Sequence, residues 1–177
     1  MDKFGPTVAI GIVFVGILVL MVLSWRRRTR RDSGIAPRTL AETGPELATA
    51  DALYVASTVH ERPMERLAPA GLGFRGRARV SVFAGAGTAG MSTDGAVSIA
   101  VDGSDEVVIP AADIVDVAPA TWTIDRVVER DGLLLIAWRD RDDAILDSYV
   151  RIVNADERER LMGAIRQVST HDANSEE

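Results

Sequence analysis

The feature that most constrains this chain is an uncharged, largely apolar stretch that runs from Phe4 to Trp25. A helix needs roughly 20 apolar residues to cross a bilayer core about 30 Å thick. Positive charge follows the stretch at once, at Arg26, Arg27, Arg28, Arg30 and Arg31. A cleaved signal peptide instead carries its positive charge before a shorter apolar run and ends at a small-residue cleavage site. The stretch is therefore predicted to be a retained transmembrane helix.

The arginines after this stretch also predict how the chain is oriented. Basic residues keep their side of a span in the cytoplasm, and only Lys3 is basic before it. The sequence thus predicts a single-pass protein of the cell membrane, with its N-terminus outside and its C-terminal domain in the cytoplasm. The same arginines lie where anionic headgroups would be, so membrane lipids are expected partners of this flank.

Charge and composition exclude several classes of function. Residues 1–31 carry six basic side chains and one acidic one, so the totals of 20 and 26 leave 14 and 25 for residues 32–177. A part so acidic argues against nucleic-acid binding, which needs a basic surface. The chain has no cysteine, which excludes disulfides and thiol chemistry, and its two histidines are too few for a histidine metal cluster. No cofactor or metal is expected.

Residues 32–51 read as a linker. Gly34, Pro37, Gly44 and Pro45 interrupt every periodic pattern in this region. A coil of this length spans roughly 25 Å. The domain that follows would therefore lie close to the membrane.

Residues 52–153 have the period-two alternation of half-buried strands. Val97, Ile99 and Val101, for example, alternate with Ser98 and Ala100. Asp-Gly pairs at 94–95, 102–103 and 131–132 favour tight hairpin turns. About seven short strands are expected, forming a sandwich or a small barrel.

One amphipathic helix is predicted over residues 154–169. Asn154 is a suitable N-cap, and Glu157 completes a capping box. An apolar stripe on one face needs a partner, and the open end of the β-structure is the nearest; the stripe consists of Leu161, Met162, Ile165 and Val168. Residues 170–177 are expected to be a disordered tail. The predicted domain is thus 52–169.

A run of antiparallel strands closed by a C-terminal amphipathic helix resembles the pleckstrin-homology-like (PH-like) superfold. Residues 109–117, Ile-Pro-Ala-Ala-Asp-Ile-Val-Asp-Val, resemble the central strand-turn-strand of bacterial PH-like domains. Residues 54–58, Arg66 and residues 71–76 are similar to a family of small actinobacterial single-pass membrane proteins with a PH-like domain. The resemblance covers residues 5–168. It implies a transmembrane helix followed by a mainly β, PH-like barrel or sandwich with a C-terminal helix, and it implies no activity.

Three short motifs match chemical signatures in part, and each is better explained as a loop or a turn. Residues 85–90 read G-x-G-x-x-G, but another strand rather than a phosphate-binding helix is expected to follow. The acidic run 140–143 lacks the glutamate that a calcium loop places at its twelfth position, where Arg151 stands. A polar cluster before these motifs is interpreted as a connecting surface loop rather than acid–base machinery: His60, Glu61, Arg62, Glu65 and Arg66.

A basic segment remains as a candidate contact surface. Between residues 62 and 79 Glu65 is the only acid, and the five basic residues are Arg62, Arg66, Arg75, Arg77 and Arg79. These side chains are possible headgroup contacts, because each basic group near an anionic surface contributes about 1 kcal/mol.

The large aromatic residues of the β-region are expected to pack in the core or at strand edges. They are Phe74, Trp122, Trp138 and Tyr149.

These observations predict a non-enzymatic membrane protein whose PH-like domain binds or scaffolds partners at the membrane surface. An unidentified protein partner is expected beside the lipids. The alternative is an accessory subunit of a transport or cell-envelope complex. A lipid reader needs a basic patch that faces the membrane, whereas a subunit needs an exposed apolar patch.

Overall fold

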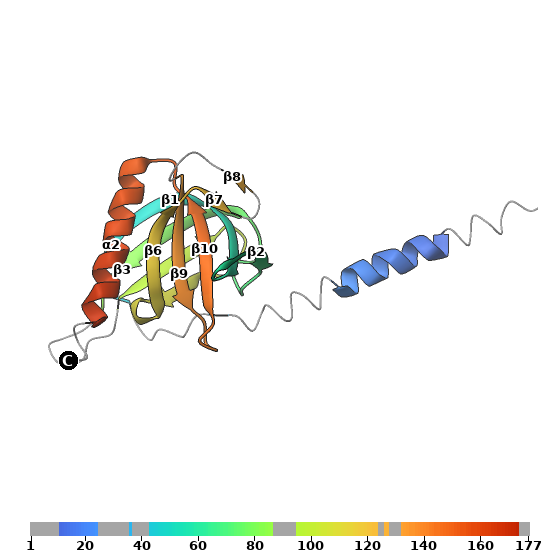
Figure 1. Cartoon of the computed structure of the whole chain (residues 1–177), viewed down its shortest axis with the longest axis horizontal. Helices are drawn as coiled ribbons and strands as arrows, with labels where there is room; N and C mark the ends of the chain where they lie inside the picture. Colours follow the sequence, from blue (N-terminus) through green and yellow to red (C-terminus); the bar gives the residue numbers. More distant parts are fainter. Residues whose placement is uncertain are drawn as a thin grey trace, which may run out of the picture.

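In a computed structural model, the described part of the chain comprises residues 11–24, 36, 43–86, 95–123, 126–127 and 132–173. Most of these residues belong to strands, and a long helix follows the last strand (Figure 1). The strands are β1 Glu46–Val59, β2 Arg62–Leu67, β3 Gly76–Phe83, β4 Ala96–Val101, β5 Val107–Pro110, β6 Ile114–Ala120, β7 Trp122–Thr123, β8 Arg126–Val127, β9 Leu133–Arg139 and β10 Ile145–Arg151. The helix is α2, Ala155–Ala173, and a short 3₁₀ turn, η1 Ala111–Asp113, joins β5 to β6. The prediction of a mainly β domain with a C-terminal helix is confirmed.

Eight of these strands form one antiparallel sheet around the long strand β1. The order is β5-β4-β3-β1-β10-β9-β6, with β2 also paired to β1. The first part of β1 pairs with β3, and its second part pairs with β10 and β2. The register with β10 shifts between Tyr54 and Ala56, as a β-bulge does when it bends a strand. The single sheet therefore folds into two halves that share β1.

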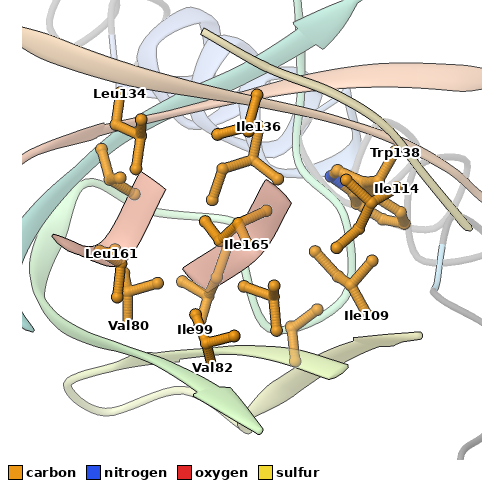
Figure 2. Packing of buried hydrophobic residues seen from close by; sticks show 14 of the residues in the cluster. Val80, Val82, Ile99, Ile109, Ile114, Leu134, Ile136, Trp138, Leu161 and Ile165 are labelled. Carbon is orange, nitrogen blue, oxygen red and sulfur yellow. The ribbon is translucent and has the colours of Figure 1, made fainter. Parts of the chain in front are cut away.

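The main core lies between these halves and is closed by α2. Figure 2 shows Leu161 and Ile165 between Leu134 and Ile136 on one side and Val80 and Ile99 on the other. Leu161 and Ile165 have 0% exposure. The predicted apolar stripe of the helix thus packs against the β-structure, as the sequence indicated.

The start of α2 is capped by the residue that the sequence identified. The Oδ1 atom of Asn154 accepts from the backbone N–H of Asp156 at 3.0 Å, and its Nδ2 donates to Glu157 Oε1 at 3.2 Å. The helix is longer than predicted, because residues 170–173 are helical rather than part of a disordered tail. Residues 174–177 lie outside the described part.

The turn chemistry agrees with the sequence where it can be seen. Gly103, after Asp102, has a φ of +79°, the positive value expected for the glycine of an Asp-Gly turn. The other two Asp-Gly pairs include Asp94 and Asp131, which lie outside the described residues. Residues 109–117 form the expected strand-turn-strand through η1.

Two parts of the expected layout are wrong. The predicted linker, 32–51, ends too late, because β1 begins at Glu46, which pairs with Phe83 of β3. The polar cluster after His60 is not only a loop, because residues 62–67 form strand β2. The start of β1 contains the small residues Ala48 and Ala50, and β2 is half charged, so neither segment has a strong apolar alternation.

Residues 11–24, the blue helix of Figure 1, are helical, and all their side chains are exposed. Among the described residues, no helix combines the length and the apolar character that membrane crossing requires. The predicted span also includes residues 4–10 and Trp25, which lie outside the described part. The five arginines at 26–31 lie outside it as well.

Candidate functional site

The two motifs that resemble nucleotide and metal sites are placed between strands. β3 ends at Phe83, and Gly85 and Ala86 follow in irregular backbone before residues 87–90, which are not described. Asp140 organises the β9–β10 turn, because its Oδ1 accepts from the N–H groups of Asp142 at 2.8 Å and Ala144 at 2.9 Å. The acidic run is thus a hairpin turn, as predicted. Among the described residues, no group of three histidine or acidic side chains could hold a metal ion.

His60 has a partner that its own segment did not reveal. Its Nδ1 lies 2.8 Å from Oδ1 of Asp147, and the side chain of Asp147 is 9% exposed. His60 is also held through its backbone N–H, which donates to the Ile145 carbonyl at 3.1 Å. The pair therefore fixes the β1–β2 turn against the start of β10.

A chain of polar side chains crosses the core behind this pair. The Tyr54 hydroxyl lies 2.9 Å from the Leu72 carbonyl oxygen and 3.0 Å from Ser57 Oγ. Ser57 Oγ is 2.7 Å from Ser148 Oγ, which also accepts from Trp138 Nε1 at 2.9 Å. Burial raises the pKa of Tyr54 to about 12, although the bond to Ser57 and the charge of Arg66 oppose the shift. A buried phenol with this pKa stays protonated at neutral pH and keeps its hydrogen-bond donor within the network.

The five candidate headgroup arginines do not form one patch. Arg62 and Arg66 lie on β2, and Arg62 faces Glu65 at 3.5 Å. Arg75 precedes β3, and Arg77 and Arg79 share one face of β3. The sequence segment therefore separates in space into a β2 part and a β3 part.

Arg77 and Arg79 line a hollow on the described surface, here named the arginine groove. It is an open groove of about 790 Å³ on the outer face of the sheet. Its lining residues are Asp51, Ala52, Leu53, Arg77, Ala78, Arg79, Ala100, Asp102, Arg151 and Val153. The groove thus combines three arginines with two aspartates and several apolar side chains.

Strand register explains why these residues meet. Leu53 of β1 is paired with Arg77 of β3 on one side and with Arg151 of β10 on the other. In the next row, Arg79 is paired with both Asp51 and Ala100. Directly paired residues point to the same face of a sheet. Arg151 is 74 positions from Arg77 in the chain, so a sequence segment could not reveal this neighbour.

Arg79 of the groove forms an ion pair with an acidic residue of the same groove. Arg79 donates to Oδ1 of Asp51 through Nε at 3.2 Å and Nη2 at 3.1 Å. The two side chains are 67% and 81% exposed. An ion pair so open to water contributes at most about 1 kcal/mol. An incoming anion can therefore replace Asp51 at little cost.

Several apolar side chains remain exposed on the described surface. Val153, at the rim of the arginine groove, is 85% exposed, Met64 of β2 is 76% exposed and Phe74 is 62% exposed. The expected packing of Phe74 is therefore wrong, because it lies in the connection before β3 rather than in a strand. Trp138 and Tyr149 are buried as expected, whereas the side chain of Trp122 lies outside the described part.

Comparison with known proteins gives one match. Residues 33–166 match a family model described as bacterial PH domain-like. The matched range includes every strand of the described sheet and the first two-thirds of α2. No curated protein and no solved structure matches the chain.

Proposed function

Because this chain belongs to the bacterial PH domain-like family, we propose that it is a non-enzymatic binding module whose arginine groove receives an anionic group of a partner. A binding or scaffolding role is what such a domain supports. The observation that carries the proposal is the convergence of Arg77, Arg79 and Arg151 from two strands on one groove. A guanidinium can hold a carboxylate or a phosphate through two parallel hydrogen bonds.

The second part of the proposal concerns the membrane. The uncharged residues from Phe4 to Trp25 anchor the protein as a single span, and the arginines after them place the domain in the cytoplasm. The resemblance of residues 54–58 and 71–76 to small actinobacterial single-pass proteins favours the same arrangement. An anchor raises the local concentration of the groove for any partner held at the same membrane.

The alternative is an accessory subunit of a transport or cell-envelope complex. The exposed side chains of Met64 and Phe74 are the observation that favours it, because a protein contact needs exposed apolar surface. Headgroup contact by Arg62, Arg66, Arg75, Arg77 and Arg79 stays a prediction. The groove accounts for only two of these five residues.

Anion binding by the full chain tests the proposal. The protein is placed in nanodiscs of neutral lipid, and fluorescence anisotropy follows two labelled probes: an inositol polyphosphate and a peptide of alternating glutamate and leucine. We expect at least one probe to bind at low salt and to weaken steeply as salt rises, because such contacts are largely electrostatic.

Two double variants distinguish an effect of the groove on binding from an effect of the protein's overall charge. Arg77→Ser with Arg79→Ser should weaken binding at least tenfold. Arg62→Ser with Arg160→Ser removes the same charge from exposed positions outside the groove and should change binding less than twofold. If neither probe binds, or if both double variants weaken binding equally, the arginine groove is not the site.

A further inference from the structure

Two described parts of the chain before β1 contact the domain: Ala36, and the pair Gly44 and Pro45, which bonds to Ala84 after β3. The carbonyl oxygen of Ala36 accepts from the backbone N–H of Arg141, in the β9–β10 turn, at 3.2 Å. Ala36 lies well before the start of β1 at Glu46, and it is half-buried. The family match also begins before this residue, at position 33. Among the described residues before β1, the earliest that contacts the sheet is thus Ala36, and it does so at the β9–β10 turn.

The arginine groove lies at the opposite end of β10 from this turn. β10 leaves the turn at Ile145 and reaches the groove at Arg151. Six residue steps at about 3.3 Å separate the two ends by about 20 Å. Figure 1 shows the β9–β10 turn at the lower end of the sheet and the start of α2, which follows Val153, at the upper end.

From this geometry we infer that the arginine groove opens away from the bilayer and that its occupant is an extended acidic segment of a protein on the cytoplasmic side. The inference rests on the proposed anchor and the proposed anion site. Eleven residue steps join Trp25 to Ala36, which limits the distance between them to about 40 Å at most. The end of the domain that carries the β9–β10 turn is therefore the end held near the membrane.

The charges around the groove favour a narrow ligand over a flat one. Asp51 and Asp102 line the groove itself, and Glu46 and Glu157 line a smaller hollow beside it that shares Asp51 and Arg79. An anionic bilayer surface would meet these four acids together with the arginines. An extended peptide can place single carboxylates on Arg77, Arg79 and Arg151 without approaching all four acids.

The apolar side chains of the groove specify the rest of the ligand. Leu53, Ala100 and Val153 lie between and beside the arginines, and Val153 is largely exposed. A phosphate group would leave them in water. A peptide in which acidic and apolar residues alternate would pair with the arginines and cover these side chains at the same time.

Two single-cysteine variants test the orientation. The natural chain has no cysteine, so Asp142→Cys in the β9–β10 turn and Val153→Cys at the groove rim can each be labelled uniquely with a donor dye. In nanodiscs that contain acceptor-labelled lipid headgroups, energy transfer from position 142 should be clearly more efficient than from position 153. Equal transfer, or the reverse order, would overturn the inference even if anionic probes bind the groove.

A second measurement tests the occupant. The labelled glutamate–leucine peptide is titrated onto the full chain in neutral nanodiscs and in nanodiscs with anionic lipid. A groove that opens away from the bilayer should bind the peptide with affinities that differ less than twofold, and Val153→Asp should weaken binding at least fivefold. Loss of peptide binding in the anionic discs at low salt means that headgroups occupy the groove. Binding of the inositol polyphosphate alone, with no peptide binding, rejects the peptide but leaves the proposed anion site intact.

Discussion

Trp138 of β9 donates its indole N–H to Oγ of Ser148 on β10 at 2.9 Å, and both side chains are fully buried. Ser148 Oγ also lies 2.7 Å from Oγ of Ser57 on β1. One hydroxyl thus joins three strands inside the core, where any polar group left without a partner would be costly.

Ser148→Ala should therefore destabilise the domain by about 1–3 kcal/mol, because the buried indole N–H of Trp138 and the Ser57 hydroxyl each lose their hydrogen bond to Ser148. For a chain of this size that corresponds to a melting temperature lower by roughly 2–4 °C per kcal/mol. Unfolding of the full chain in detergent can be followed by tryptophan fluorescence, to which the buried Trp138 contributes beside Trp25 and Trp122. Ser104→Ala, in the β4–β5 turn, is the matched control and should melt like the parent. Equal melting of both variants would mean that the network does not stabilise the core.

A second prediction concerns alkaline pH. Burial raises the pKa of Tyr54 from 10.0 to about 12, and it also raises the pKa of Tyr149, with the charge of Asp147 adding to the shift. Because the folded state holds these protons more tightly than the unfolded state, the stabilisation is complete below pH 10 and is lost as pH rises toward 12. A difference of two pKa units between the folded and unfolded states corresponds to about 3 kcal/mol in the free energy of unfolding.

Melting temperatures measured from pH 8 to pH 12 test this. The melting temperature of the parent should fall steeply above pH 10, and that of Tyr54→Phe should fall less over the same range. At pH 8 the variant should already melt at a lower temperature, because the hydrogen bonds of the Tyr54 hydroxyl are missing. If the melting temperatures of the two proteins fell in parallel as pH rises, the pKa of Tyr54 would not be raised in the folded state.

Two glycines with the same backbone conformation make a matched pair. Gly71 and Gly103 have φ values of +81° and +79°. A Cβ at Gly71 would lie 2.6 Å from the Asp105 carbonyl oxygen and against Val107, whereas a Cβ at Gly103 would meet nothing within 4 Å. Alanine should cost about 1 kcal/mol at Gly103, from conformation alone, and clearly more at Gly71, where the neighbouring turn must also move. Equal losses in chemical denaturation would contradict the tight packing of these two loops.

The helix and the domain class could be read from the sequence because they depend on local patterns. Leu161 and Ile165 repeat with the period of a helix, and Asn154 marks its start, so the closing face of α2 followed directly. The start of β1 was missed because Ala48 and Ala50 are small and give a weak alternation. Phe74 was misplaced because an aromatic residue in a connection looks the same in sequence as one in a strand.

The candidate site could be predicted only in part, because it depends on register between distant strands. Arg77 and Arg79 belong to a basic run of the sequence, but that run does not form one surface in the structure. Arg151 joins them through the pairing of Leu53 with both neighbouring strands, and Asp147 joins His60 across the β1–β10 pair. A shift of one residue in either pairing would move these side chains to the other face.

The last prediction concerns orientation in the membrane. A reporter fused after Glu177 should be active only in its cytoplasmic form, because Arg26, Arg27, Arg28, Arg30 and Arg31 all follow the uncharged stretch whereas Lys3 alone precedes it. A fluorescent protein that matures only in the cytoplasm and an alkaline phosphatase that folds only outside give opposite signals at the same position. Replacing the five arginines by serine is the control, and it should reduce the fraction in the predicted orientation. Carbonate washing of the membranes should leave the parent chain in the pellet. Phosphatase activity from the parent fusion would reverse the topology, and release of the chain by carbonate would remove the anchor on which the direction of the arginine groove depends.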